Sequence, residues 1–175
     1  MTICPYCDYE NIEGADICEE CEQPLSHLHL PAPATAVERR LLRDRIRLLD
    51  PKTPIAVARE TPVRDVLRMM VQRSIGCVVV VEDKKPVGIF TERDALLKLN
   101  TDAVALGGKP VADFMTAAPE TLDSAAKIAF AVHRMDLGGY RHIPIVSEDG
   151  NLTGIISVRD ILRYLTQSMT GVDSA

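Results

Sequence analysis

An internal repeat is the feature that most restricts how this chain of 175 residues can fold. A repeat of this length means that one structural unit is built twice and that the copies bury their apolar faces together. The copies are related by a shift of 65 residues, or of 66 residues after one inserted residue. The identical pairs are Pro54 and Pro119, Met70 and Met135, Val80 and Val146, Glu82-Asp83 and Glu148-Asp149, Gly88 and Gly154, and Arg93-Asp94 and Arg159-Asp160.

Both copies have the same order of predicted elements, which begins with an extended start at 55–58 or 120–123. An amphipathic helix follows, with an apolar face of Val63, Val66, Leu67 and Met70 in the first copy and of Ile128, Val132 and Met135 in the second. The next elements are a buried strand at 77–81 or 142–146, a hairpin turn at 82–85 or 148–151, and a strand at 87–90 or 153–156. A closing helix begins near Glu92 or Val158. The chain is therefore expected to have an α+β fold with two β-α-β-β-α repeats packed about a pseudo-twofold axis.

Four of the five cysteines lie at the N-terminus as two C-x2-C pairs, Cys4 with Cys7 and Cys18 with Cys21. A tight turn within each pair directs two thiolates at one ion, and two pairs complete a tetrahedral site. Disulfides are one alternative, but they are rare in reducing compartments, and no secretory signal is visible. A redox C-x-x-C is another, and it needs only one pair. We expect a metal site, with zinc as the first candidate and iron as the second, since tetrahedral sulfur sites accept both.

The residues around these cysteines resemble the zinc-ribbon modules of prokaryotic proteins. The resemblance rests on Cys4-Pro5-Tyr6-Cys7, on residues 11–21 and on Pro24-Leu25. Such ribbons usually place glycine, with positive φ, after the second cysteine of each knuckle, where this chain has Asp8 and Glu22. Residues 1–27 carry seven acidic side chains and no Lys or Arg, within a net charge of −5 for the chain. This acidity favours a structural or protein-docking module over a DNA-binding one, and metal binding is expected to supply its folding energy.

The remaining composition argues against several classes of protein. The longest apolar run, 77–81, is far shorter than the roughly 18 residues that a membrane span requires. The 4% aromatic content and the acidic N-terminus weigh against nucleic-acid binding. Without a secretory signal, a cytoplasmic protein is expected. The fifth cysteine, Cys77, is interpreted as a buried apolar residue, and no nucleophile with a base is visible, so an enzyme is not expected.

Residues 28–47 are expected to connect the ribbon to the repeats. Pro31 and Pro33 indicate an extended linker over residues 27–34. Thr35 is placed to cap a helix that continues to about Leu49. Its apolar stripe is surrounded by Arg39, Arg40, Arg43, Arg45 and Arg47. We interpret the arginines as a solvated helix face because acidic residues interrupt them; the alternative is binding to phosphate or to an acidic partner, including the ribbon itself.

The two copies resemble the paired cystathionine-β-synthase (CBS) domains of a Bateman module over about residues 48–168. The matching motifs of the first copy are Thr61-Pro62-Val63-Arg64-Asp65-Val66-Leu67, Gly76-Cys77-Val78-Val79-Val80 and Gly88-Ile89-Phe90-Thr91-Glu92-Arg93-Asp94. Those of the second are Tyr140-Arg141-His142-Ile143-Pro144-Ile145-Val146 and Gly154-Ile155-Ile156-Ser157-Val158-Arg159-Asp160, after a linker-like Val111-Ala112-Asp113-Phe114-Met115-Thr116. The resemblance implies CBS domains at 48–110 and 111–170 behind the ribbon at 1–27, and it implies a homodimer.

The resemblance also implies where an adenine nucleotide binds. In CBS domains an Asp contacts the ribose, and a Thr or Ser contacts the phosphate. The matching residues are Asp94 with Thr91 in the first copy and Asp160 with Ser157 in the second. The alternative is that each pair only caps the helix that follows, because a hydroxyl at the N-cap and a carboxylate three residues later form a capping box.

The two implied nucleotide sites are not equal. The second copy has Arg141 and His142 before its strand, where related modules place phosphate-binding residues, whereas the first has Ile75 and Gly76. We therefore expect the second site to be the stronger one. The other residues expected at the ligands are the basic residues Arg93 and Arg159 and the apolar walls Val57, Val78, Ile89, Leu122, Pro144 and Ile155.

The leading functional hypothesis is a regulatory protein whose CBS pair binds AMP, ADP, ATP or a related adenosyl ligand. The ribbon would then serve structure or contact with an unidentified protein partner. The second hypothesis is a ligand-free dimerisation adaptor, in which the ribbon alone carries the interaction. The third is a rubredoxin-like electron carrier, which would hold iron in place of zinc.

Overall fold

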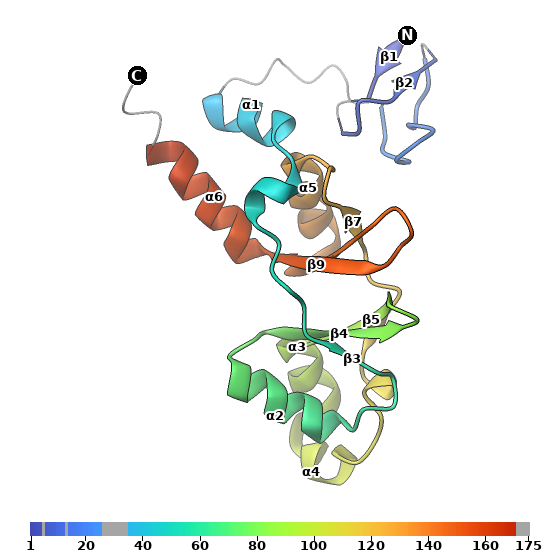
Figure 1. Cartoon of the computed structure of the whole chain (residues 1–175), viewed down its shortest axis with the longest axis vertical. Coiled ribbons are helices and arrows are strands. Elements are labelled where there is room, and N and C mark those ends of the chain that lie inside the picture. Colours follow the sequence, from blue (N-terminus) through green and yellow to red (C-terminus); the bar gives the residue numbers. More distant parts are fainter. Residues whose placement is uncertain (5, 13, 26–34, 171–175) are drawn as a thin grey trace. The chain divides into compact units, whose positions relative to one another are not determined.

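The structure is a computed structural model that describes residues 1–4, 6–12, 14–25 and 35–170 (Figure 1). The linker predicted at residues 27–34 lies outside the described residues. The chain divides into two compact units. The first unit comprises residues 1–50, 124–141 and 157–175, and the second comprises residues 51–123 and 142–156.

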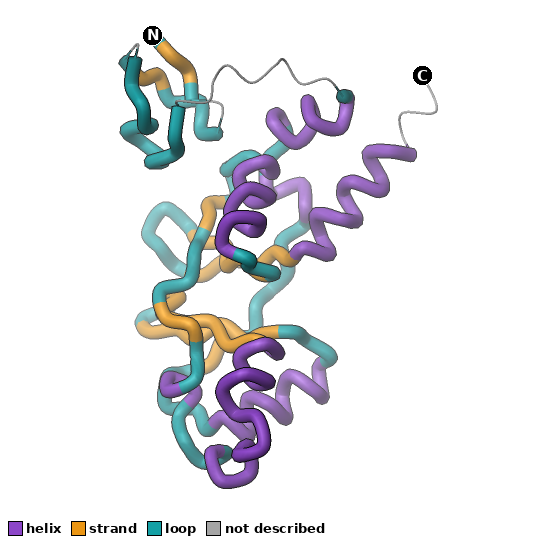
Figure 2. The backbone as a smooth tube through the Cα atoms, turned by 180° about the vertical axis from the view of Figure 1, so that it is seen from behind, coloured by secondary structure: helices purple, strands orange, loops and turns teal. Residues whose placement is uncertain are grey.

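The second unit contains the strands of both repeats, except for the last residue of β9 (orange in Figure 2). The first repeat forms a four-stranded sheet of β3 (Ala56–Val57), β4 (Cys77–Glu82), β5 (Lys85–Thr91) and β6 (Thr116–Ala117), in that order. The second repeat forms a three-stranded sheet of β7 (Leu122–Asp123), β8 (His142–Val146) and β9 (Leu152–Ser157). In both sheets the first strand runs parallel to the second, because a helix lies between them in sequence. The predicted strands are confirmed to within two residues at each end; β6 was not predicted.

The core of the first repeat is built on the predicted apolar face of α2 (Val63–Arg73). Val63, Val66 and Met70 are buried there, and Leu67 packs at the margin. The helix ends at Ser74, which has a left-handed backbone conformation (φ 51°). The other buried members of this core are Val57, Val78, Val80, Phe90, Leu99, Val111 and Phe114.

The closing helix of the first repeat begins at Glu92 as predicted, but it soon changes type. The single turn α3 (Glu92–Asp94) continues as the π-helix η2 (Ala95–Leu99) and the 3-10 turn η3 (Asn100–Asp102). Leu99, at the end of the wide π-turn, is buried in the core. The short helices α4 (Ala103–Leu106) and η4 (Val111–Asp113) then lead to the second repeat.

The segments that lead into the two repeats are exchanged between their sheets. Thr116, which precedes the second repeat, pairs with Ile89 of β5 in the first. Lys52, which precedes the first repeat, pairs with Ile155 of β9 in the second through two backbone hydrogen bonds of 3.0 and 2.9 Å. Each sheet is thus completed by the segment that leads into the other repeat. This reciprocal pairing is the pseudo-twofold relation that the repeat predicts.

Two repeat-related glycines permit this exchange. A Cβ added to Gly88 would lie 2.1 Å from Sδ of Met115, and one added to Gly154 would lie 2.9 Å from Cβ of Pro51. Both distances are shorter than any ordinary contact, so a side chain at either position would push the exchanged segment away from the sheet. Glycine at both positions therefore leaves room for side chains of the exchanged segments, Met115 at Gly88 and Pro51 at Gly154.

The first unit contains the ribbon, α1 (Ala36–Arg43), the 3-10 helix η1 (Ile46–Leu49), α5 (Ile128–Gly138) and α6 (Val158–Thr170). α1 contacts α5 and α6, and those two helices contact each other. Thr35 caps α1 as predicted and forms a capping box with Glu38. Within the described residues, no helix combines the length and apolar character needed to cross a membrane.

The helix predicted to continue to about Leu49 instead ends at Arg43, so that prediction is wrong by about 1.7 turns. Asp44 is extended, and its carbonyl accepts a hydrogen bond from the backbone N–H of Ile128 (2.9 Å). The backbone N–H of Ile46 donates to the carbonyl of Ala126 (2.8 Å). Pairing with the segment before α5 therefore replaces helical hydrogen bonds, which a local apolar period cannot reveal.

Candidate functional site

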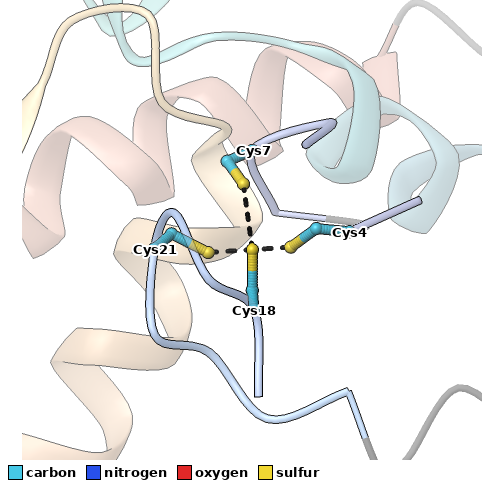
Figure 3. A group of neighbouring side chains, drawn as sticks. All are labelled: Cys4, Cys7, Cys18 and Cys21. Atoms are coloured by element: carbon cyan, nitrogen blue, oxygen red, sulfur yellow. Dashed lines mark hydrogen bonds between the residues drawn. The ribbon is translucent and has the colours of Figure 1, made fainter. Parts of the chain in front are cut away.

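The four N-terminal cysteines come together at one point (Figure 3). Their Sγ atoms all lie within 4.8 Å of one another, and the Cys4–Cys21 and Cys7–Cys18 pairs are each 3.6 Å apart. A disulfide would bring two sulfurs to about 2 Å. Four sulfurs around one ion at about 2.3 Å would be about 3.8 Å apart. The cluster therefore fits a tetrahedral metal such as zinc, with two ligands from each predicted knuckle.

The two knuckles have the same backbone structure. In each, the first cysteine accepts a hydrogen bond from the N–H four residues later and donates one to the carbonyl five residues later, at 2.8–3.0 Å. Asp8 and Glu22, which stand where related ribbons usually have glycine, have φ values of 65° and 56°. This conformation costs a residue with a side chain about 1–2 kcal/mol. The predicted turn geometry is confirmed in both knuckles, although neither has glycine.

Asn11 contacts the cysteine cluster, and the spacing of the cysteines did not predict this contact. It lies on β2 (Glu10–Asn11), which pairs with β1 (Thr2–Ile3), and it is 1% exposed. Its Nδ2 donates to Cys18 Sγ (3.5 Å), and its Oδ1 accepts from the N–H of Glu19 (3.0 Å). An asparagine between two C-x2-C pairs carries no sequence signal of such a contact, because only the folded ribbon brings it to the sulfur.

These donors prepare Cys18 to bind a metal ion. Burial opposes ionisation of this thiol, but hydrogen bonds from the backbone of Cys21 and Glu20 and from Asn11 together lower its pKa from 9.0 to about 6. A metal ion binds the thiolate form of cysteine. Cys18 therefore needs to lose no proton on binding at neutral pH.

In the first repeat, Thr91 and Asp94 form a capping box at the start of α3. Thr91 N and Oγ1 donate to Asp94 Oδ2 (2.9 and 2.6 Å), and the N–H of Asp94 donates back to Thr91 Oγ1 (3.2 Å). Asp94 Oδ1 accepts from Lys98 Nζ (2.8 Å) and Thr116 Oγ1 (3.1 Å). Burial raises the pKa of Asp94, but the hydrogen bonds from Lys98 and Thr91 outweigh it and lower the pKa below its usual value. Both carboxylate oxygens are thus bound within the protein.

In the second repeat, Ser157 and Asp160 have the same arrangement at the start of α6. Ser157 N and Oγ donate to Asp160 Oδ2 (2.8 and 2.7 Å), and Asp160 Oδ1 accepts from Arg163 Nη1 (3.0 Å). Asp160 is 5% exposed, whereas the Arg163 side chain is 53% exposed. The carbonyl of Arg141 accepts from the N–H of Val158 (3.0 Å), which brings Arg141 to the same helix start. The complete capping box is confirmed in the first repeat, and in the second the Asp160 carboxylate caps the N–H of Ser157. The nucleotide interpretation stays a prediction.

The imidazole of His142 lies beside Gly76, the residue at the related position in the first repeat. A Cβ added to Gly76 would be only 3.3 Å from His142 Cε1. The missing side chain in the first copy thus leaves room for the imidazole of the second. This accounts in physical terms for the absence of a basic residue at position 76.

The other predicted ligand residues divide between the two units. Arg159 lies in the first unit, and Val57, Val78, Ile89, Arg93, Leu122, Pro144 and Ile155 lie in the second. Val78 pairs with Phe90 and faces the core of the first repeat, whereas Ile89 lies on the opposite face of the sheet. Val57 and Val78 are therefore buried in that core. Contact of these apolar residues with a nucleotide stays a prediction. That residues of both units bind the same nucleotide also stays a prediction.

Comparisons with known proteins find relatives of the two repeats. The profile of the CBS domain family matches residues 46–100 and 111–167, which follow the ribbon. An uncharacterized protein of Methanopyrus kandleri is 36% identical over 109 residues, which are 59% of this chain and 53% of that relative. The present chain thus spans about half the length of this relative.

Two solved structures extend the comparison. A CBS-domain containing protein from Agrobacterium tumefaciens aligns with a TM-score of 0.62 and 28% identity over 68% of this chain and 96% of that one. A CBS domain protein from Pyrobaculum aerophilum complexed with AMP aligns with a TM-score of 0.59 and 26% identity over 71% of this chain and 99% of that one.

Proposed function

Because this chain belongs to the CBS domain family, we propose that it is a regulatory protein, without enzymatic activity of its own, whose CBS pair binds an adenine nucleotide. The observation that carries the proposal is the Ser157–Asp160 pair at the start of α6. A nearly buried carboxylate stands there beside a hydroxyl and the first turn of a 13-residue helix.

This pair offers two kinds of contact to a nucleotide. A carboxylate accepts hydrogen bonds from both hydroxyls of a ribose, as Asp160 would do. A hydroxyl and the N–H groups at a helix N-terminus favour the phosphate, as Ser157 and the first turn of α6 would do. Arg141, which is exposed beside this helix start, would add positive charge for the phosphate.

The second repeat is the better candidate because Arg141 stands beside its helix start, whereas the first repeat has Ile75 at the related position. The cation paired with Asp160 is Arg163, whose side chain is 53% exposed. In the first repeat, Lys98 binds Asp94 and also donates to the carbonyls of Phe114 and Met115 (2.8 and 3.1 Å). A ribose at Asp94 would have to break this anchored contact. We therefore propose one strong site in each chain, at Asp160.

AMP is the first ligand to test, because the Pyrobaculum relative was solved with AMP. We expect isothermal titration calorimetry to show binding of AMP to the purified full chain, with about one strong site per chain. ADP, ATP and S-adenosylmethionine should be titrated in parallel to rank the adenosyl ligands. Absence of heat with all four would contradict the sensing function and would favour the ligand-free adaptor.

We further propose that the ribbon binds one zinc ion through Cys4, Cys7, Cys18 and Cys21 and serves structure or contact with a partner protein. Four sulfur ligands would leave zinc no open position for substrate, so the ion would hold the fold together. Iron in the same site would instead support electron transfer. Elemental analysis of the purified chain distinguishes the two metals.

We propose that the chain forms a homodimer. Its helices expose large apolar side chains that a monomer would leave in water. In the second unit these are Val71, Leu96, Leu97 and Val104, and in the first they include Leu137 and Leu162. Leu96 and Leu162 are related by the repeat. Light scattering coupled to gel filtration is expected to give twice the chain mass of 19.2 kDa, and a monomer at micromolar concentration would contradict the proposal.

A further inference from the structure

The first knuckle of the ribbon contacts the start of α5 through the side chain that replaces glycine. One carboxylate oxygen of Asp8 accepts from Arg45 Nη2 (2.7 Å), and the other accepts from Lys127 Nζ. Lys127 is only 8% exposed, and a buried ammonium is costly unless a charge partner accompanies it. The carboxylate of Asp8 is therefore an important partner of this lysine and not an incidental surface charge.

Arg45 and Lys127 also have contacts that do not involve the ribbon. Arg45 and Lys127 face each other across an antiparallel backbone bridge. Arg45 Nη1 also donates to the carbonyl of Ala125 (3.0 Å). Because this hydrogen bond restrains the Arg45 guanidinium, a carboxylate that binds it loses less freedom than it would on a mobile surface.

An aromatic contact lies beside this ion pair. The ring of Tyr6 lies 5.7 Å from that of Phe130 and 5.9 Å from that of His133, on successive turns of α5. Phe130 is buried, and Arg134 lies over its ring at 5.0 Å. Tyr6 and Asp8 flank the cluster cysteine Cys7, so one short turn supplies both contacts. We call Arg45, Lys127, Phe130 and His133 the docking face.

The knuckle can present Tyr6 and Asp8 together only while it keeps its shape. The ribbon has a very small core, whose buried members are Cys4, Cys18 and Leu25. The N–H of Tyr6 points at Cys4 Sγ (3.4 Å), and Asp8 is held at a φ of 65°. Two of the three core residues are thus proposed metal ligands, and a chain this short needs the metal to hold such a turn.

We propose that the first knuckle is a metal-dependent latch that binds the docking face, which Arg45 and the start of α5 form together. Loss of the metal releases Tyr6 and Asp8 and uncovers Lys127 and Phe130. Whether the ribbon holds its metal thus decides whether the start of α5 is covered or exposed. The inference rests on the proposed metal site, but the contact itself can be tested separately from the metal.

The second knuckle provides a matched control. Glu22 has the same backbone conformation as Asp8, but it is exposed, and within the described ranges no ion pair involves it. Glycine at position 8 or 22 would relieve the same backbone strain. Only Asp8→Gly would also remove the contact with Arg45 and Lys127.

The experiment compares the wild-type full chain, Asp8→Gly and Glu22→Gly, each loaded with zinc and after treatment with a chelator. Native mass spectrometry gives the zinc content, and hydrogen exchange gives the protection of peptides spanning residues 126–134. With zinc bound, we expect Asp8→Gly to exchange about tenfold faster there than wild type and Glu22→Gly to match wild type. After chelation, wild type should exchange as fast as Asp8→Gly. Should Asp8→Gly fail to retain zinc, Lys127→Gln, which leaves the knuckle sequence intact, replaces it.

The outcomes separate the latch from the metal site. Equal exchange in zinc-loaded wild type and Asp8→Gly would overturn the latch while leaving the zinc site standing. Protection that survives complete chelation would overturn its metal dependence. A wild-type chain that takes up no zinc would contradict the proposed metal site, and the comparison of wild type with Asp8→Gly would then still decide whether the knuckle docks.

Discussion

Replacement of Cys18 by serine is expected to abolish zinc binding and unfold the ribbon, while the CBS pair keeps its fold. Cys18 is both a member of the sulfur cluster and one of the few buried residues of the ribbon. Structural zinc supplies about 10–16 kcal/mol to the folding of zinc-finger peptides, far more than so small a core can provide. Elemental analysis should find less than a tenth of the wild-type zinc, and the amide signals of the ribbon should collapse in a heteronuclear NMR spectrum.

Cys77→Ser is the control for this change, because it makes the same chemical substitution outside the cluster. Cys77 is buried in β4, and burial, helped by the charge of Glu92, raises the pKa of its thiol to about 12. It is therefore a neutral thiol and a poor metal ligand. The variant should lose some stability of the first repeat but keep its zinc. Full zinc content in Cys18→Ser would contradict the proposed ligand set.

The second large effect is expected for Asp160→Ala, which should weaken AMP binding by at least about tenfold in calorimetry. The substitution removes the oxygens proposed to accept both ribose hydroxyls, and hydrogen bonds to a charged group contribute about 1.5–3 kcal/mol. Asp94→Ala is expected to change the affinity by less than about threefold, because Lys98 and Thr116 already occupy the outer oxygen of that carboxylate.

The two aspartate variants control for each other. Both carboxylates accept from the backbone and hydroxyl of the residue that begins the following helix. Each alanine should therefore cost a similar free energy of unfolding, on the order of 1 kcal/mol, in chemical denaturation. If both variants weakened AMP binding equally, the assignment of the strong site to Asp160 would be wrong.

The sequence predicted those parts of the fold that depend on local order. The central strands β4 and β8 follow from short apolar runs, and these strands are buried on both faces. The helices α2 and α5 follow from an apolar period of 3.6 residues, because one face of each is buried. The capping box at Thr91 and the Ser157–Asp160 hydrogen bonds were equally visible, since they depend on residues three positions apart. The cysteine cluster follows from spacing, because each pair forms its own turn.

The features that the sequence did not predict depend on partners distant in the chain. α1 ends at Arg43 because Asp44 pairs with Ile128, and no local pattern records that pairing. Asn11 and Lys127 acquire their roles only when the ribbon is folded and lies against α5. A contact of the ribbon with the arginines of residues 28–47 was one of the alternatives, and the structure shows such a contact for Arg45.

The exchanged leading segments impose an order of events on a newly made chain. Lys52 pairs with Ile155, which leaves the ribosome about a hundred residues later. The sheet of the second repeat is therefore complete only after Ile155 has been made. The sheet of the first repeat likewise waits for Thr116, which belongs to the approach to the second. Neither half is therefore a separable module, and cutting the chain between the repeats would leave each product without the strand that its twin supplies. The two repeats of such a protein therefore fold together and not one after the other.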